Sequence, residues 1–347
     1  MNDLERAKKE RRGYYTSIRD ENLNFHRRGL NARVGMVSCG EDGDSRAPLI
    51  GVIQVNAGPG DPLRGLHLHT GDAINLVVEG AMCMDGTWLR PGQAKIVPRD
   101  LIYGDPIASK DGCIFLEIFE SHDQARPVFD NPRDQRYFDE VHGQYMADVI
   151  GRRDSPATTR SVEKPARAWE IAKFDEIDET WVKTGGLSSR CVFIGTRNSP
   201  DAPVGIAIKA DRNISDLVAS RRSFPTTTAM VVLDGSVMHD RRWMSVGDIF
   251  VCPPNQMNGD LVFGPDGAVI FLMFDKRLGI IPKFEDEKDQ AGFDTLLRKN
   301  AEEVASGQCE KSVAILPLRD KHTKGRAIVY ETIEAVERYR AETGTEW

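Results

Sequence analysis

The sequence lacks the features that mark several large classes of protein. Its six cysteines are scattered without a Cys-x-x-Cys pair, which argues against a zinc ribbon and a disulfide framework. No apolar run approaches the roughly 18 residues needed to cross a bilayer. The basic opening MNDLERAKKERRGYY has no apolar segment behind it, so we expect no secretory signal. These absences predict a cytoplasmic protein with no membrane partner.

Motifs for nucleotide chemistry and serine hydrolysis are also absent. The chain has no GxxxxGK[ST] phosphate loop, no GxGxxG after a strand and no GxSxG turn. Its formal net charge of −7 does not favour a surface for nucleic acid. What is present is a chain of 347 residues with 40% hydrophobic content, enough for one large or two medium domains. We expect its partner to be a small molecule.

The most informative feature is a pair of histidines in GLHLHTGDAINLVVEG. His67 and His69 lie one residue apart before a predicted strand, and the chain has only seven histidines. Side chains two apart on a strand share a face, so both imidazoles are expected to point into one cavity. Two neutral imidazoles are the usual nucleus of a Zn, Fe, Ni or Cu site. The alternative is a pair of ordinary surface or core histidines.

The residues around this pair resemble the motifs of the cupin superfamily. Five of them fit its first motif of a glycine, an HxH pair, an acidic residue and a closing glycine: Gly65, His67, His69, Asp72 and Gly80. Three fit its second motif: Pro91, Gly92 and Pro98. Tyr103 stands where the family has its third histidine. The resemblance implies a jelly-roll β barrel that holds a metal.

An internal repeat suggests two such barrels. Shifted by about 155 residues, VVEGAMCMDGTWLRPGQAKIVP lies over VVLDGSVMHDRRWMSVGDIFVCP, which aligns Trp88 with Trp243 and Gly92 with Gly247. A repeat this long means two copies of one β module. The same shift places five other residues, Arg222, Phe224, Thr227, Asn258 and Leu272, over His67, His69, Asp72, Tyr103 and Glu117. We therefore predict a metal site in the first copy and a structural second copy.

The predicted fold class is all-β, with two tandem double-stranded β-helix (jelly-roll, cupin) barrels and helical N- and C-terminal extensions. Five segments are expected: a helical arm (1–31), the first barrel (32–122), a linker with a short helix near 137–149 (123–166), the second barrel (167–275) and a helical tail (276–347). In the tail, helical periodicity covers 293–307 and 327–344. Such apolar stripes must be covered, so we expect a homodimer or higher homo-oligomer.

Three further residues are candidates for chemistry. Asp72 follows a glycine, so its carboxylate could turn toward the metal and complete a facial triad with His67 and His69; it could equally be a turn residue. Tyr103 is expected to ligate the metal as phenolate or to act as acid or base, unless it is a packed tyrosine. Glu117 lies in the apolar run CIFLEIF, where a carboxylate is costly unless it is paired or bound.

Three hypotheses on function follow from these candidates. The resemblance is to the gentisate 1,2-dioxygenase-like group of bicupins, which implies an Fe(II) oxygenase acting on a small carboxylated or hydroxylated aromatic compound. The second hypothesis is a metal-dependent lyase or isomerase that uses Zn, Mn or Ni and in which Tyr103 or Glu117 moves the proton. The third is a non-catalytic binding or assembly protein. The fold alone does not choose among them.

Overall fold

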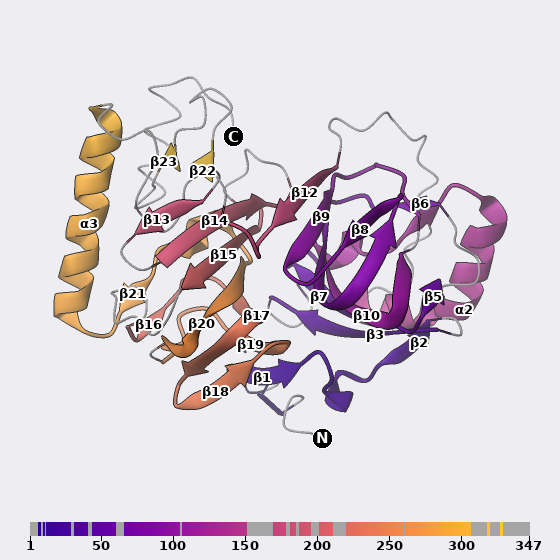
Figure 1. Ribbon diagram of the computed structural model, residues 1–347, viewed down its shortest axis with the longest axis horizontal. Coiled ribbons are helices and arrows are strands. Elements are labelled where there is room, and N and C mark those ends of the chain that lie inside the picture. The colour runs from indigo at the N-terminus through magenta and orange to yellow at the C-terminus, as the bar shows by residue number, and fades with distance from the viewer. Residues whose placement is uncertain are drawn as a thin grey trace. The chain divides into compact units, whose positions relative to one another are not determined.

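The structure is a computed structural model, and it describes residues 6–7, 10, 12–28, 31–40, 44–59, 66–104, 106–150, 169–177, 181–184, 187–195, 201–210, 220–259, 261–306, 318–319 and 327–328. The chain divides into two compact units, one formed mainly by residues 16–175 and the other by residues 5–15 and 176–347. Both are antiparallel β structures (Figure 1). The two-barrel, all-β architecture implied by the resemblance to bicupins is confirmed.

The first unit is built on a nine-stranded sheet of the described residues, with the main order β12-β9-β7-β10-β4-β3-β2. Its strands are β2 (His26–Arg28), β3 (Ala32–Ser38), β4 (Leu49–Val55), β5 (Gly58–Pro59), β7 (Ala73–Met84), β8 (Thr87–Leu89), β9 (Gln93–Val97), β10 (Ile107–Phe119) and β12 (Glu170–Lys173). A small second sheet pairs β6 (His67–Leu68) with β11 (Val128–Phe129). The short helices are η1 (Glu21–Leu23) and η2 (His122–Gln124).

The second unit is built on an eight-stranded sheet, with the main order β1-β19-β17-β20-β15-β14-β13. Its strands are β1 (Tyr14–Ser17), β13 (Val182–Thr184), β14 (Leu187–Phe193), β15 (Val204–Ala210), β17 (Thr228–His239), β18 (Arg242–Ser245), β19 (Asp248–Cys252) and β20 (Leu261–Phe274). Two small pairs accompany it: β16 (Arg222–Ser223) with β21 (Lys283–Phe284), and β22 (Leu318–Arg319) with β23 (Ala327–Ile328). A short helix, η4, covers Arg277–Ile280.

The internal repeat extends through almost the whole of both units. An offset of 155 residues carries the bounds of β3, β4, β6, β7, β9 and β11 onto those of β14, β15, β16, β17, β19 and β21. The same offset carries helix α2 (Pro132–Ile150) onto α3 (Glu287–Ala305). Each helix begins with an equivalent cap, because Asn131 Oδ1 accepts from the Arg133 N–H and Asp286 Oδ1 accepts from the Lys288 N–H. The helices are therefore parts of the repeated module.

The interior of the first barrel is set by the alternation of β10. Cys113 and Phe115 belong to its core, and Glu117 lies on the same face two residues further on. Antiparallel pairing places Glu117 opposite Gly51 of β4 and Asn75 of β7. The sequence-based expectation that Glu117 shares a face with Cys113 and Phe115 agrees with this register.

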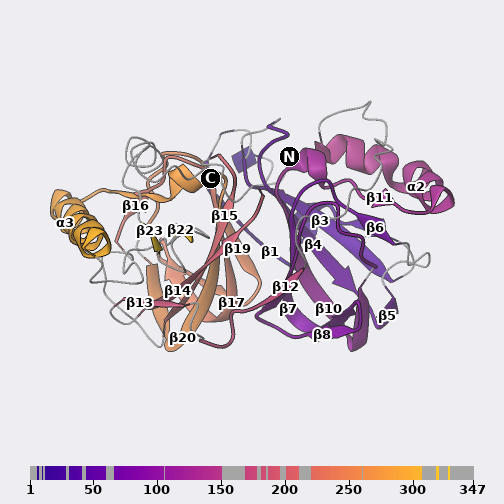
Figure 2. The same ribbon diagram turned by 90° about the horizontal axis from the view of Figure 1, so that it is seen from above.

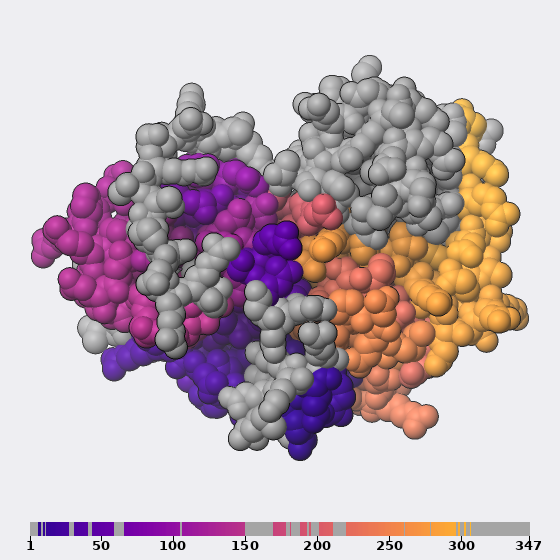
Figure 3. Space-filling view, turned by 180° about the vertical axis from the view of Figure 1, so that it is seen from behind, coloured from indigo at the N-terminus to yellow at the C-terminus, as the bar shows by residue number. Residues whose placement is uncertain are grey.

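Helix α2 runs along the first unit beside β6 and β11, and its outer side forms part of the surface of the unit (Figures 1, 2 and 3). Phe138 and Met146 are buried, whereas Val141 is 49% exposed. One apolar side of the helix therefore faces the barrel. Within the described residues, no helix is both long enough and apolar enough to span a membrane.

Four predicted segments differ in the structure. The segment 1–31, expected to be helical, contributes strands β1 and β2, because sheet edges are available to pair their backbones. The second barrel was expected to start at 167, yet β12 pairs with β9 of the first sheet. The linker helix and the helix expected at 293–307 appear as the longer α2 and α3. The helix expected at 327–344 lies outside the described residues, apart from β23 (Ala327–Ile328).

A buried histidine makes the second unit sensitive to acid. His239 is 3% exposed, and the Tyr15 hydroxyl lies 2.9 Å from its Nδ1. Burial lowers the pKa of His239 from 6.5 to about 4; Asp240 opposes the shift, and Arg222 adds to it. Because the unfolded chain then binds a proton that the folded chain does not, stability is present above about pH 6.5 and falls as the pH drops toward 4.

We expect the free energy of unfolding to fall by about 2 kcal/mol more in the wild type than in His239→Gln between pH 7 and 5, since one pKa unit corresponds to about 1.4 kcal/mol. Urea unfolding at both pH values measures this difference. Glutamine keeps a polar neutral side chain near Tyr15 and does not titrate. Equal pH dependence in the two proteins would contradict the assignment.

Candidate functional site

The histidine pair is held by a short bridge to Tyr103. The His67 N–H donates to the Tyr103 carbonyl at 3.0 Å, and the Tyr103 N–H donates to the His67 carbonyl at 2.9 Å. Both imidazoles are buried, and their ring centroids lie 5.4 Å apart at an interplanar angle of 89°. The Tyr103 ring lies 4.6 Å from that of His67. The three side chains predicted from the HxH motif and its downstream tyrosine therefore come together.

The backbone of η2 fixes the tautomer of His69. Its Nδ1 lies 3.2 Å from the Gln124 carbonyl oxygen, and a carbonyl oxygen can only accept, so Nδ1 carries the proton. Gly71 allows η2 to approach this closely, because a Cβ at that position would fall 2.2 Å from Gln124 Oε1. In the neutral ring, Nε2 is therefore the nitrogen that carries the lone pair and can act as an acceptor or a metal ligand.

That nitrogen faces the carboxylate of Glu117. His69 Nε2 and Glu117 Oε1 are 3.9 Å apart, which is too long for a direct hydrogen bond. The Tyr103 hydroxyl donates to the same Oε1 at 3.0 Å. Both side chains of the ion pair are almost fully buried. A neutral imidazole nitrogen and a carboxylate are both acceptors, so this pair of groups could hold a cation or a hydrogen-bond donor between them.

Asp72 does not join these residues, which corrects its predicted role as a metal ligand. Its Oδ1 accepts from the backbone N–H of Arg99 at 2.9 Å, and the Arg99 guanidinium lies 3.8 Å away. The Asp72 N–H donates to Glu120, whose pKa is raised by burial in opposition to Arg99. The carboxylate of Asp72 therefore ties the loop after the histidines to Arg99. The alternative of a turn residue describes Asp72 better.

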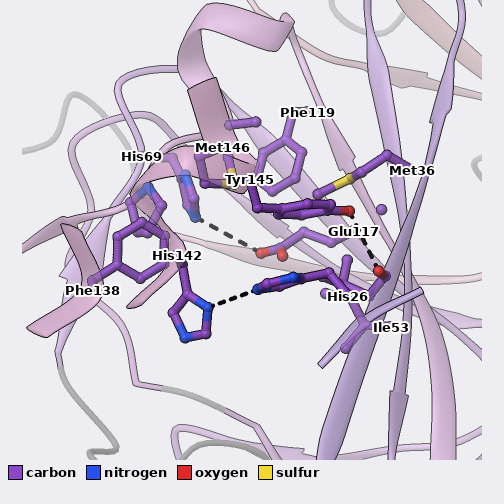
Figure 4. A pocket seen from close by; sticks show the side chains of 14 residues that line it. His26, Met36, Ile53, His69, Glu117, Phe119, Phe138, His142, Tyr145 and Met146 are labelled. Carbon is purple, nitrogen blue, oxygen red and sulfur yellow. Dashed lines mark hydrogen bonds and ion pairs between the residues drawn. The ribbon is translucent and has the colours of Figure 1, made fainter. Parts of the chain in front are cut away.

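A small pocket opens in front of His69 and Glu117 (Figure 4). Its walls are mainly apolar, and its polar lining residues come from several elements: His26, His69, Glu117, His142 and Tyr145. The His26 ring is stacked on that of Tyr145 with centroids 4.3 Å apart. His26 Nε2 and His142 Nδ1 are 3.0 Å apart and share a hydrogen bond. Burial lowers the pKa of His26.

Sequence reasoning missed His26, His142 and Tyr145. A signal existed for the helix residues, because Phe138, His142, Tyr145 and Met146 have the spacing of one helical face. No signal marked His26, since its strand was expected to be helical. Burial raises the pKa of Tyr145 to about 12, so its phenol stays protonated. Cys113, in the barrel core, is not a nucleophile, because burial raises the pKa of its thiol to about 12.

The nitrogen and oxygen atoms that converge here are of the kinds that bind divalent metals. The predicted triad of His67, His69 and Asp72, however, does not form. Among the described residues, no three His, Cys, Asp or Glu side chains form a cluster that could hold a metal ion. The converging donors are His69, Glu117 and the Tyr103 phenol. Metal bonds of about 2.1 Å allow two ligand atoms to lie up to about 4.2 Å apart, and the 3.9 Å between Nε2 and Oε1 lies within that limit.

The second unit keeps the backbone of this site and replaces its chemistry. Arg222 and Asn258 form the same isolated bridge as His67 and Tyr103. Arg222 is buried, whereas its neighbour Arg221 pairs with Asp240 and Glu285 at the surface. Leu272 replaces the carboxylate of Glu117. That the second copy lacks a metal site stays a prediction.

No protein-family model matches this sequence, and no curated protein sequence matches it. Among solved structures, a mutant of oxalate decarboxylase from Bacillus subtilis is similar at 12% identity, over 84% of this chain and 83% of that chain, with a TM-score of 0.46. A Nostoc punctiforme protein, provisionally assigned as a dioxygenase, is similar at 11% identity over 80% and 87% of the two chains, with a TM-score of 0.49. Likenesses this weak support no conclusion about the reaction.

The position of Asp72 leads to a prediction that separates stability from binding. Asp72→Asn removes the charge that holds Arg99 and weakens a buried acceptor, so we expect a loss of about 1–3 kcal/mol in unfolding free energy. Bound metal per chain should be unchanged, because the Asp72 carboxylate is held by the backbone N–H of Arg99. Urea unfolding and elemental analysis of the same samples measure both quantities. Loss of metal from a folded variant would restore Asp72 as a ligand.

Proposed function

We propose that the first unit is the active site of a metal-dependent enzyme acting on a small molecule. The observation that carries this proposal is the opposed pair of acceptors, His69 Nε2 and Glu117 Oε1, buried 3.9 Å apart at one wall of the pocket. An imidazole nitrogen and a carboxylate oxygen this close together are both able to coordinate a cation. A bound divalent metal, with Fe(II) favoured and Zn, Mn or Ni as alternatives, satisfies both groups.

Each residue then has a definite role. His69 and Glu117 would hold the metal with Tyr103, and His67 would complete the set after a change of side-chain rotamer. The metal would supply a Lewis acid and, if it is iron, a site for O₂ activation. Tyr103 holds a proton on its hydroxyl, directed at Glu117. Phe119, Phe138 and the stacked His26 and Tyr145 rings provide flat apolar surfaces against which an aromatic substrate can pack.

Two reaction classes fit this site. The first is an Fe(II) oxygenase acting on a carboxylated or hydroxylated ring, which is favoured by the ring-lined pocket. The second is a lyase or isomerase, which is favoured by the hydrogen bond between Tyr103 and Glu117, because an acid and a carboxylate in contact can relay a proton. The oxygenase would consume O₂ only when substrate is present. The lyase would turn over without O₂ and with metals other than iron.

Metal content is the first test of the proposal. We expect about one divalent ion per chain in the wild type and a marked loss in the His67→Ala/His69→Ala double variant, since imidazole nitrogens are the strongest donors of the set. Elemental analysis measures the ion, and circular dichroism checks that both proteins are folded. Asp72→Asn serves as the matched control. Equal metal content in the wild type and the double variant, or no metal in either, would contradict the proposal and favour a non-catalytic binding protein.

The second test concerns Tyr103. Tyr103→Phe keeps the ring beside His67 and removes the hydroxyl that donates to Glu117. If that proton takes part in the reaction, kcat should fall by about two or more orders of magnitude, while the unfolding free energy should change by about 1 kcal/mol. Steady-state kinetics and urea unfolding measure the two effects. Full activity of the variant would make Tyr103 a packing residue.

A further inference from the structure

A lysine lies fully buried inside the first barrel. The exposed fraction of Lys95, in β9, is 0%. Its side chain is on the same face of the strand as that of Val97, which belongs to the core cluster that also contains Tyr103. An ammonium group in such an interior is costly unless it is paired. Lys95 takes no part in the proposed function, so its burial needs an explanation.

The partner of Lys95 leads toward the candidate site. Its ammonium group is ion-paired with Oδ2 of Asp85, in the turn between β7 and β8 (Figure 1). The other oxygen of this carboxylate, Oδ1, accepts from the Gly104 N–H at 3.3 Å. Gly104 directly follows Tyr103, whose backbone forms the bridge to His67. A continuous chain of contacts therefore runs from Lys95 to the backbone of Tyr103.

The second unit keeps the carboxylate and the glycine of this chain of contacts. Asp240 and Gly259 stand 155 positions after Asp85 and Gly104. Both aspartates have a left-handed backbone, with φ of 47° at Asp85 and 49° at Asp240. A Cβ on Gly259 would fall 1.9 Å from Oδ1 of Asp240, so the turn lies against the segment after the bridge in this unit too. The contact between turn and bridge is therefore part of the repeated module.

The two units differ in the cation that holds the carboxylate. Asp240 pairs with Arg221 at 3.2 Å at the surface, where their side chains are 42% and 41% exposed. At the position of Lys95 the second unit has Phe250, which is part of an apolar core. At the position of Arg221 the first unit has Leu66. The barrel therefore closes without a buried lysine, and the unit that has one is the unit with the candidate site.

A buried cation holds its partner more firmly than an exposed one. Exposed pairs contribute little, because solvent screens them and both long side chains lose rotamer freedom. The side chain of Asp85 is 34% exposed, whereas that of Lys95 is 0% exposed. The carboxylate can turn to water only by leaving the ammonium group unpaired in the core, which is strongly unfavourable. Lys95 thus keeps Asp85 in place over the Gly104 N–H.

We propose that Lys95 is a positioning residue for the candidate metal site, and that it acts through Asp85 on the backbone that carries Tyr103. This backbone exchanges two hydrogen bonds with that of His67, so a displacement of the segment moves both side chains relative to Glu117. The inference rests on the proposed function, because it assigns Lys95 to the same site. Lys95 does this without contacting metal or substrate.

The test compares full-length wild type, Lys95→Met and Lys95→Met/Leu66→Arg. Methionine fills the core without a charge, and the arginine rebuilds the surface pair of the second unit. Amide hydrogen exchange of the metal-free proteins, followed by NMR, reports on the segment. Competition with a chelator measures the Kd for Zn²⁺.

In Lys95→Met we expect exchange at the Tyr103 and Gly104 amides to become about tenfold faster, as for the loss of one hydrogen bond. The Kd for Zn²⁺ should rise by about tenfold or more, the usual effect of losing a residue that orients metal ligands. Both quantities should return close to the wild-type values in Lys95→Met/Leu66→Arg. The Asn258 amide, in the equivalent bridge of the second unit, is the internal control and should not change.

Unchanged exchange at the two amides in Lys95→Met would overturn the proposal. Faster exchange with an unchanged Kd for Zn²⁺ would make Lys95 a residue of local stability only, and acceleration that includes Asn258 would mean a general loss of stability. A double variant as altered as Lys95→Met would exclude the path through Asp85.

If Lys95→Met does not fold, Lys95→Met/Asp85→Ala replaces it. That variant leaves no unpaired charge and no acceptor for the Gly104 N–H, so it should show the same local acceleration and the same rise in Kd; wild-type values in it would overturn the proposal. Should the wild type bind no Zn²⁺, the proposed enzyme fails, and the exchange rates still decide whether Lys95 holds the Tyr103 segment.

Discussion

The buried carboxylate of Glu117 is the constraint around which the first barrel is arranged. A charge in such an interior requires partners, and the structure supplies two: the hydroxyl of Tyr103 and the imidazole of His69. The HxH segment, η2 and the central strands are all positioned with respect to it. Gly71 contributes by letting η2 approach, which sets the proton on the far nitrogen of His69.

The two units of the chain allow the same strand framework to be compared with two different interiors. Six strands of one unit match six of the other in length at an offset of 155 residues. The interior row Glu117, Asn75 and Lys95 is nevertheless polar, whereas the equivalent row Leu272, Met230 and Phe250 is apolar. One packing contact is reversed between the units. Gly71 faces Gln124 in the first unit, and at the equivalent positions of the second unit Thr226 faces Gly279. Small and large residues have changed places and the backbone path is kept. The second unit is therefore a barrel of the same kind whose interior is filled by apolar side chains.

Much of this could be predicted from the sequence, and the failures have physical causes. The repeat and the HxH pattern predicted two barrels and brought together His67, His69 and Tyr103, because strand periodicity is a local signal. Asp72 was misplaced because a nearby carboxylate can serve a loop as well as a metal, and the choice depends on Arg99, distant in sequence. His26 was missed because its strand was expected to be helical, and because its contact with His142 joins residues 116 positions apart, which periodicity within one segment does not show.

The edge strands of the two sheets have a consequence for the order in which the chain can fold. The first sheet ends in β12, which follows the whole of the first repeat, and the second sheet ends in β1, near the start of the chain. During synthesis, β1 is made first but its partner β19 lies roughly 230 residues later. Such distant pairing is slow, because the entropy of closing a long loop must be lost before the contact contributes any favourable energy. A ribosome-bound chain therefore carries an unpaired β1 until β19 (Asp248–Cys252) has emerged, so this edge is exposed to aggregation during that interval.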